Sequence, residues 1–540
     1  MDAKRSESPR WVGWVEVLAL SMLALAWCVS RCAWHVLDPR ETAWMHNGDW
    51  EVYYQAWLLH TRGPWTLQLG AIPGLLYPHG LSVFYSGANF WLCLVGKLVA
   101  PFISGEFQLY GLFYLVGYVA QVLAYRWALT RAGVTGGARL AGALLGLVSP
   151  VLMARMGHIA LMLHALTIVQ VGLAVRVWRR PELAASTARW TVGVAVFAVG
   201  IEAYLAGQAI PLALAVLAIT RLSGRRPWRL LVVDVALLGA GVLFMLWQVG
   251  AIPGGDVDRG ADGFGQFSSD LFALFNSQGY SKWVPALPSG PRQGEGFAYL
   301  GVGGLAVLPV AAVSLGLWLR RRGVRALVHL WPLVVVVLLT AAYAWSSHVT
   351  VKGAEVLNLE WAFAPFASVT RAFRTCGRFI WPLHYLVSLG TIALAARALK
   401  WKGLAAVFLC VAAAAQAYEL NANTPAFFSP PAPPIGPAWT GLGERYRHVE
   451  IVPVQVQWVC DYNPAVVSFL TRVAAQERMT INSGNVGRVP RAVKAACGAA
   501  FTGPMDLQTL YIVAPGHEGD VGLAGGRAQT IDGLTLLTAQ

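Results

Sequence analysis

The chain has 540 residues, of which 56% are hydrophobic and 13% are charged. Soluble globular proteins carry about 25% charged residues, so this composition excludes a soluble enzyme and indicates a polytopic membrane protein. The net charge of +14 comes from short basic clusters between apolar runs. That pattern sets membrane orientation and excludes nucleic acid as a partner.

The N-terminal residues MDAKRSESPR form a short basic head before the first apolar run, and no convincing cleavage site follows. We interpret this start as a retained signal-anchor. The apolar runs along the chain are 12–34, 88–103, 108–130, 138–153, 159–178, 189–205, 206–221, 229–250, 298–319, 326–346, 378–396 and 402–418.

The basic residues between the runs decide which runs cross the membrane. If residues 88–103 crossed it, every later arginine-rich loop would lie outside, so we predict that this run is a helix on the outer face. Eleven spans remain, with the N-terminus in the cytoplasm and the C-terminus outside. The runs 138–153 and 189–221 are short for their roles, and the second must be a pair turning at Glu202-Ala203-Tyr204. The basic residues then assigned to the cytoplasm are Lys4, Arg5, Arg10, Arg131, Arg139, Arg176, Arg179, Arg180, Arg221, Arg225, Arg226, Arg229, Arg320, Arg321, Arg322, Arg325, Arg397, Lys400 and Lys402.

Residues 36–87 form the first long polar interruption, with Asp49 at its centre in His46-Asn47-Gly48-Asp49-Trp50. Glu41 and Glu51 lie close by in the sequence. The surrounding aromatic residues are Trp44, Trp50, Tyr53, Tyr54, Trp57 and Trp65. A carboxylate at a membrane surface between aromatic walls is suited to take a proton from a substrate that arrives in the bilayer plane. The alternative is an interfacial anchor whose acids only face water.

Two later outer turns carry further candidates. Arg155-Met156-Gly157-His158 lies at the outer end of a span, His164 follows it, and Glu202 lies at another outer turn. A histidine and a glutamate can bind a divalent cation, but the spacing of His158 and His164 does not place them on one helical face. We therefore regard metal binding as weakly indicated, with hydrogen-bonded histidines in the bundle as the alternative.

The loop 251–297 contains Asp256, Asp258, Asp262 and Asp270, and ends near Glu295 between two glycines. Its length favours a functional loop or a packed cap. Glu295 is suited either to bind sugar hydroxyls or to pair with a nearby arginine, and the sequence leaves both open. Farther on, Arg371, Arg374 and Arg378 are spaced to share one helical face on the outer side, an arrangement that suits phosphate oxygens. Binding to bulk lipid headgroups is the alternative.

The Pro-rich residues 424–437 are typical of an extended linker. They separate a membrane domain, residues 1–423, from a predicted small α/β domain, residues 438–540. Within that domain we predict strands at 448–456, 479–481, 509–513 and 535–537, and a helix at 464–478. Cys460 and Cys497 are the cysteines of this tail. We predict that they form a disulfide, because an outer compartment is oxidising.

Four stretches carry a family resemblance: Gly48-Asp49 with Pro64-Trp65 and Leu69-Gly70, Arg155–His158, Glu295–Gly301, and Phe373–Pro382. On these, the chain resembles the GT-C superfamily of polytopic glycosyltransferases. It looks most like an uncharacterised family of large bacterial membrane proteins within that group. The resemblance implies an all-α polytopic bundle with juxtamembrane helices in the first outer loop, set in the bacterial inner membrane, with the α/β domain outside the cytoplasm.

The resemblance also implies a reaction. A sugar would pass, with inversion, from a polyprenyl-phosphate donor to an envelope glycan, lipid or protein acceptor, and Asp49 would deprotonate the acceptor. Arg155, Arg371, Arg374, Arg378 and Lys97 would hold the donor phosphate. The expected substrate contacts are Trp50, Glu51, Tyr54, His158, Glu202, Glu295 and Tyr299. No Asp-Asp or Asp-Glu pair stands at the first-loop site, so a Mg²⁺ or Mn²⁺ cofactor stays open.

Two other classes of function remain. A transporter or flippase of lipid-linked saccharide would need ionisable residues near mid-membrane and an internal repeat. We find no repeat in the sequence, and the ionisable residues gather at the outer face. The other alternative is a non-catalytic component of an envelope polysaccharide assembly, which would tolerate loss of Asp49.

Overall fold

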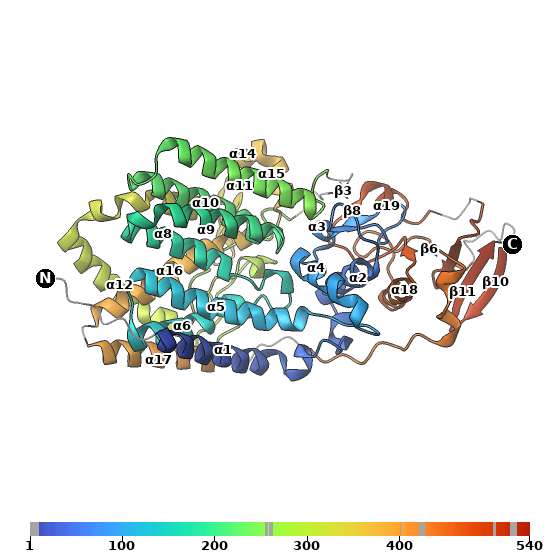
Figure 1. Cartoon of the computed structure of the whole chain (residues 1–540), viewed down its shortest axis with the longest axis horizontal. Coiled ribbons are helices and arrows are strands. Elements are labelled where there is room, and N and C mark those ends of the chain that lie inside the picture. The colour runs from blue at the N-terminus through green and yellow to red at the C-terminus, as the bar shows by residue number, and fades with distance from the viewer. Residues whose placement is uncertain are drawn as a thin grey trace.

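The structure is a computed structural model that describes residues 10–253, 257–258, 263–399, 401–420, 427–499, 504–518 and 526–539. It is mostly helical, with a smaller region near the C-terminus that contains a sheet. Figure 1 shows the helices side by side along the long axis and the sheet at one end. Several residues named above lie outside the described residues: Lys4, Arg5, Asp256, Asp262, Lys400 and 424–426.

Within the described residues, nine helical segments are long and apolar enough to cross a membrane. Each exceeds or approaches the roughly 20 residues that a bilayer core requires. They contain α1 (Arg10–Cys32), α5 (Tyr110–Ala132), α6 (Gly136–Leu147) with α7 (Pro150–Met153), α8 (Ala165–Arg179), α10 (Ala203–Leu222), α11 (Trp228–Gln248), α12 (Gly301–Arg322), α13 (Trp331–Trp345) and α16 (Trp381–Ala398). These segments indicate a multi-pass membrane protein.

The predicted count of eleven spans is not confirmed. The predicted spans 189–205 and 402–418 correspond to α9 (Ala184–Val199) and α17 (Lys402–Glu419). The helix α9 has 16 residues, and the apolar part of α17 is Gly403–Glu419, so both are shorter than a standard span. Both nevertheless pack along the bundle, α9 against α10 and α17 against α6.

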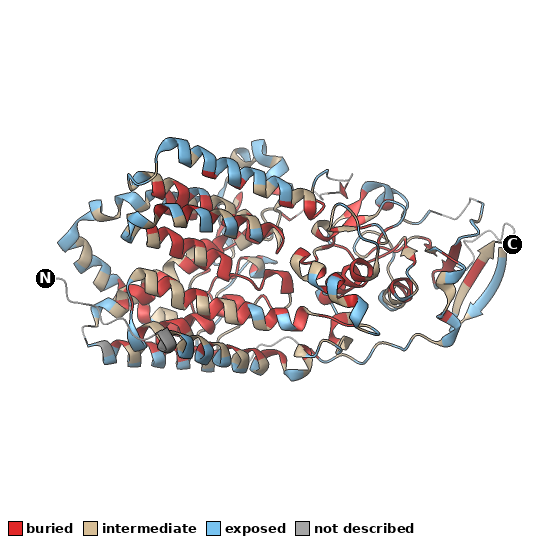
Figure 2. Cartoon of the chain, in the orientation of Figure 1, coloured by how far each residue is buried: buried red, intermediate tan, exposed pale blue. Residues whose placement is uncertain are grey.

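Apolar side chains on the outside of the bundle fit a lipid environment. Leu237, Leu243 and Phe244 of α11 are exposed, as are Leu18 and Met22 of α1. Figure 2 shows the buried residues gathered along the middle of the bundle and the exposed ones on its outer helices. A soluble protein rarely exposes so much contiguous apolar surface, which agrees with the composition.

The run 88–103 forms α4 (Phe90–Val99) and a short 3₁₀ turn, Ala100–Phe102. A helix of 10 residues extends about 15 Å, half the thickness of the hydrocarbon core. It therefore does not cross a bilayer. It packs against α2 (Asp49–Arg62) of the first loop, and Figure 1 shows both helices beside the C-terminal region.

The C-terminal region is built on a five-stranded sheet in the order β10-β11-β9-β6-β7. The strands β6 (His448–Val452), β7 (Thr480–Ile481), β9 (Thr509–Val513) and β11 (Leu534–Ala539) occur where strands are predicted, and α18 (Pro464–Gln476) where a helix is predicted. β6 runs parallel to β7 and β9. The strand β10 (Gly526–Ile531) is not predicted, because its exposed residues lack an apolar alternation. Cys460 and Cys497 form a disulfide.

Two loops at this end of the bundle pair with the C-terminal region through backbone atoms. Ile481 at the sheet edge accepts a hydrogen bond from the Tyr77 amide at 2.9 Å and donates one to the Gly74 carbonyl at 2.8 Å. A second pair joins β3 (Val257–Asp258) to β8 (Val489–Pro490). The helix α18 also packs on α2. First loop and C-terminal region therefore form one body at one end of the bundle.

Candidate functional site

Asp49 is placed by a turn that requires glycine. Gly48 has φ 55° and ψ −136°, a conformation that side-chain-bearing residues rarely adopt. The turn lets α2 begin at Asp49, so the carboxylate lies at the helix N-terminus, where the helix dipole favours negative charge. The Asp49 side chain is 58% exposed, which leaves it open to a substrate.

His158 connects Asp49 to a second carboxylate. Its Nε2 lies 3.3 Å from Asp49 Oδ2 and 3.5 Å from Glu295 Oε1. An ionised carboxylate only accepts hydrogen bonds, so a proton on Nε2 would face both carboxylates. His158 is therefore oriented between one exposed acid and one mostly buried acid.

Glu295 is held by two arginines. Its Oε2 lies 2.8 Å from Arg155 Nη1 and 3.0 Å from Arg378 Nε. A second guanidinium nitrogen of Arg155 donates to the Gly294 carbonyl at 2.8 Å, and the Arg378 guanidinium lies 4.6 Å from the centre of the Tyr204 ring. With these contacts the two arginine side chains are only 6% and 11% exposed. We name Asp49, His158, Glu295, Arg155 and Arg378 the polar cluster.

Two glycines allow these segments to meet. A Cβ atom on Gly377 would lie 2.7 Å from the Gly296 backbone, and one on Gly296 would lie 2.4 Å from Ser269 Cα. Neither contact is tolerable, so only glycine lets the 3₁₀ turn Gln293–Gly296 approach the 3₁₀ turn Cys376–Ile380. This close approach brings Glu295 to Arg378.

The charges of the polar cluster shift its pKa values in different directions. Partial burial, and next the negative charge of Glu295, raise the pKa of Asp49 against the opposing effect of Arg378. Burial and Arg378 lower the pKa of His158 to about 3, although Glu295 attracts its proton. Burial alone would raise the pKa of Glu295, but attraction by Arg378 and then Arg155 outweighs it and holds that pKa well below its usual range. At neutral pH His158 is neutral and Glu295 is ionised.

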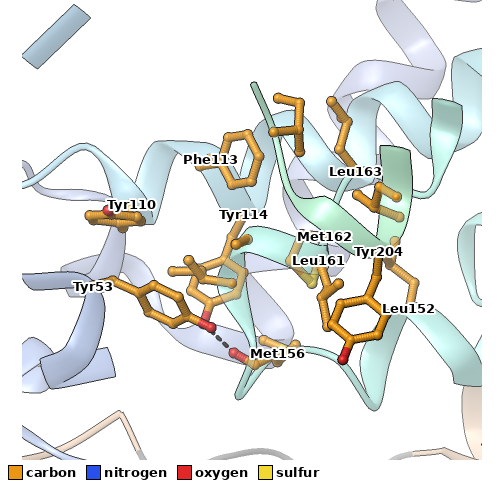
Figure 3. Packing of buried hydrophobic residues seen from close by; sticks show 14 of the residues in the cluster. Tyr53, Tyr110, Phe113, Tyr114, Leu152, Met156, Leu161, Met162, Leu163 and Tyr204 are labelled. Carbon is orange, nitrogen blue, oxygen red and sulfur yellow. Dashed lines mark hydrogen bonds between the residues drawn. The ribbon is translucent and has the colours of Figure 1, made fainter. Parts of the chain in front are cut away.

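Glu202 lies behind the polar cluster. Its carboxylate caps α10 by accepting from the Tyr204 amide at 2.5 Å and from the Leu205 amide at 3.3 Å. Burial raises its pKa, against the positive charge of Arg378. Figure 3 shows Tyr204, Tyr53 and Tyr114 in the packed layer around Met156, next to the Arg155–His158 turn. The Tyr204 ring packs against the Arg378 guanidinium. The sequence indicated Tyr204 only as part of a turn and not as a site residue.

Several of the predicted substrate contacts have partners within the protein. The Trp50 indole donates to Tyr114 at 3.0 Å and stacks on Phe427. The Tyr54 hydroxyl donates to Glu106 at 2.8 Å, and Tyr299 is fully buried with its hydroxyl 3.3 Å from Glu419. These contacts involve the polar atoms of the three side chains, and their role in binding substrate stays a prediction.

Glu51 faces the C-terminal region and not the polar cluster. It is 5% exposed and accepts from Gln55 at 3.2 Å, with Ser468 and Asn485 close to its carboxylate. Burial raises its pKa, against these hydrogen bonds. Because Ser468 belongs to α18, Glu51 contributes to the contact between the first loop and the C-terminal region.

The structure places the predicted phosphate ligands on separate segments. Lys97 donates to the carbonyls of His60 at 3.0 Å and Pro64 at 2.7 Å. His60 lies eleven positions after Asp49 on α2 (60 − 49), about 16 Å along the helix. Arg371, Arg374 and Arg378 do not share a helical face, because α15 (Ala367–Ala372) ends before the next turn begins at Cys376. Arg371 is exposed and Arg374 half-buried. Within the described residues, neither donates a side-chain hydrogen bond.

A metal centre finds no support in this geometry. Across the described ranges, no group of three or more His, Cys, Asp or Glu side chains is arranged to hold a metal ion. His158 has two carboxylates near one ring nitrogen, and both arginines compete for Glu295. His164 lies elsewhere, with its Nδ1 at 2.7 Å from the Tyr385 hydroxyl.

Two protein-family models match the chain. Residues 21–421 match the family described as a domain of unknown function (DUF6311), and residues 438–539 match the DUF6311 C-terminal domain. No curated protein matches the chain. Neither family match connects the chain to GT-C glycosyltransferases, so that resemblance stays a prediction. Because the first match covers well over half of the sequence, the chain belongs to the DUF6311 family.

Proposed function

We propose that the chain is a GT-C-type membrane glycosyltransferase. In this proposal it transfers a sugar from a polyprenyl-phosphate donor to an envelope glycan, lipid or protein acceptor on the outer face of a bacterial inner membrane. The observation that carries the proposal is the setting of Asp49. It is an exposed carboxylate at the end of a membrane bundle, 3.3 Å from a neutral histidine. Partial burial, and next the negative charge of Glu295, raise its pKa.

These features suit a general base. A raised pKa makes the ionised Asp49 carboxylate a stronger proton acceptor. His158 Nε2 lies 3.3 Å from Asp49 Oδ2 and limits the positions that this carboxylate can take. Glu295 keeps its charge because Arg155 and Arg378 hold it, and that charge sustains the raised pKa of Asp49.

The proposed transfer is one inverting displacement. Asp49 takes the acceptor hydroxyl proton as the acceptor oxygen bonds to the anomeric carbon of the sugar. The bond from that carbon to the phosphate oxygen breaks at the same time, and polyprenyl phosphate leaves as the anion. The reaction needs one base and cationic stabilisation of the leaving phosphate, without a covalent intermediate.

Arg371 and Arg374 are the arginines best suited to the phosphate. Arg155 and Arg378 form ion pairs with Glu295, so we assign them to positioning that carboxylate. Arg371 is exposed and Arg374 half-buried on the segment that leads into Arg378. Guanidinium forks bind phosphate oxygens without losing a proton.

Lipid mass spectrometry on cells with and without the gene tests the proposed class. We expect cells lacking the chain to accumulate a polyprenyl-phosphate sugar on the outer leaflet and to lose one envelope glycan. A transporter would instead leave the lipid-linked sugar on the cytoplasmic leaflet, which protection from a membrane-impermeant oxidant detects. Accumulation on that leaflet, or no accumulation, would reject the transferase.

A further inference from the structure

A second site lies at the end of the bundle away from the C-terminal region. An apolar cavity of about 180 Å³ opens between α5, α8, α12 and α16. Its lining includes Val171, Gly172, Leu389 and Gly390. It also includes Trp178, Arg179 and Arg397, which lie in the last turns of α8 and α16. The cavity is therefore lined by hydrocarbon inside and by cations at the entrance.

The two entrance arginines converge on one helix end. Arg179 Nη1 donates to the Arg131 carbonyl at 3.0 Å, and Arg397 donates to the Ala132 carbonyl. These are the last carbonyls of α5, where the helix dipole favours positive charge. Arg179 and Arg397 are exposed, and the guanidinium group of Arg397 has five N–H donors, so it can bind a further group from outside while it keeps its bond to the Ala132 carbonyl.

The charged groups around this cavity are mostly positive. The positive charges of Arg176 and Arg180 repel that of Arg131, and the charge of Arg179 repels that of Arg397. Among the described residues, no carboxylate lies within ion-pair distance of Arg131, Arg176, Arg180 or Arg397. The nearby acid Glu16 is already paired with Arg126 and Arg139, and Asp234 with Arg226. We name Arg131, Arg176, Arg179, Arg180 and Arg397 the arginine cluster.

We propose that this cavity binds an anionic phospholipid from the leaflet at that end of the bundle. One acyl chain would lie in the apolar cavity, and the headgroup phosphate would accept hydrogen bonds from Arg179 and Arg397. An anionic lipid fits better than a zwitterionic one. The ammonium group of a zwitterionic headgroup would add a positive charge beside the arginine cluster. Basic pockets between membrane helices bind such headgroups in this way. The site is independent of the proposed transferase chemistry.

Thermal unfolding of the full chain in detergent tests the proposal. We expect phosphatidylglycerol to raise the Tm of the wild-type chain by about 2–4 °C over the same amount of phosphatidylcholine. Inorganic phosphate alone should have no effect, because the acyl chain supplies part of the binding. Equal Tm values in the two lipids, or an equal gain from phosphate alone, would overturn the proposal.

Two variants separate this site from general attraction to charge. Arg179→Gln/Arg397→Gln should lose the phosphatidylglycerol effect, whereas Arg320→Gln/Arg322→Gln, at the end of α12 and outside the cavity lining, should keep it. Equal loss in both pairs would show only bulk surface charge and reject the site.

A cavity-filling change tests the acyl chain without touching the arginines. Gly390 lines the cavity, and a Cβ atom there meets nothing within 4 Å, so Gly390→Leu fills the space without a clash at Cβ. Gly390→Leu should abolish the Tm gain from phosphatidylglycerol. This variant keeps the proposal testable if Arg179→Gln/Arg397→Gln does not fold. Gly239→Leu, at an equally open position on α11 outside the lining, is the matched control and should retain it. Retention in Gly390→Leu would contradict an acyl chain in this cavity.

Discussion

Beside the C-terminal region, two buried arginines meet the carboxylate of Glu295, whereas the opposite end gathers the arginine cluster around an apolar cavity. The first arrangement balances charge internally and fixes side chains at defined distances. The second leaves positive charge at an exposed entrance. The difference suggests that the polar cluster is built to position reacting groups, while the arginine cluster attracts an anion from its surroundings.

The largest effect on stability is expected where the internal balance is broken. Glu295→Gln leaves Arg155 and Arg378 mostly buried without their carboxylate, and removing one partner of a buried pair costs about 3–5 kcal/mol. We expect this loss in the free energy of unfolding, measured as a lower Tm in detergent. Glu355→Gln, a change to an exposed acid that contacts His348, is the control and should lie within about 0.5 kcal/mol of wild type. Equal stability of the two variants would mean that Glu295 is not held as described.

The same substitution at the two ends sharpens the comparison. Arg155→Gln removes a bond to Glu295 and one to the Gly294 carbonyl, which should cost about 1–3 kcal/mol. Arg397→Gln, in phosphatidylcholine, removes an exposed group and should cost less than about 0.5 kcal/mol. Thermal unfolding of both variants under one condition measures the difference. A larger loss of unfolding free energy in Arg397→Gln than in Arg155→Gln would contradict the view that charge is balanced internally at the Glu295 end.

The pH dependence of transfer should report the raised pKa of Asp49. The base works only when ionised, so the rate should fall on the acid side with an apparent pKa above the ordinary value of about 3.9. Glu295→Gln removes a negative charge that raises this pKa, so the acid limb should move to lower pH. Rate profiles of both proteins test this order. A limb that moves to higher pH would contradict the coupling between the two acids.

The smallest effect is the salt dependence of lipid stabilisation. The Debye length falls from about 10 Å at 0.1 M to about 3 Å at 1 M ionic strength, so the Tm gain from phosphatidylglycerol should shrink across this range. The Tm difference between wild type and Glu295→Gln should change less, because buried pairs are screened less. A lipid effect that is insensitive to salt would argue against binding through the arginine cluster.

Much of this organisation was predictable from the sequence. Hydrophobic runs and basic clusters predict the membrane bundle, and the alternation of apolar residues predicts four of the five strands of the C-terminal sheet. Asp49, His158, Glu295, Arg155 and Arg378 were all candidates, because each lies at a polar turn beside an apolar run. The structure brings these five together.

The remaining features depend on contacts that sequence spacing does not encode. Lys97 and Tyr299 look available in the sequence, but their partners, the His60 and Pro64 carbonyls and Glu419, come from other segments. The arginine spacing suggested one helix, whereas the chain leaves the helix at Phe373. The clasp between Gly74–Tyr77 and Ile481 joins residues about 400 positions apart through backbone atoms alone, so no side-chain pattern marks it.

One measurement tests the central claim, that Asp49 is the working carboxylate. Cells lacking the chain are complemented with wild type, Asp49→Asn or Glu41→Gln, another acid of the same loop, and their lipids are analysed by mass spectrometry. Loss of a positioned base reduces turnover by about 10²–10⁴-fold, so Asp49→Asn should accumulate the polyprenyl-phosphate sugar as the null does. Glu41→Gln should restore the glycan, and the purified Asp49→Asn chain should keep the wild-type Tm. Full complementation by Asp49→Asn would contradict the account and make the first loop an interfacial anchor.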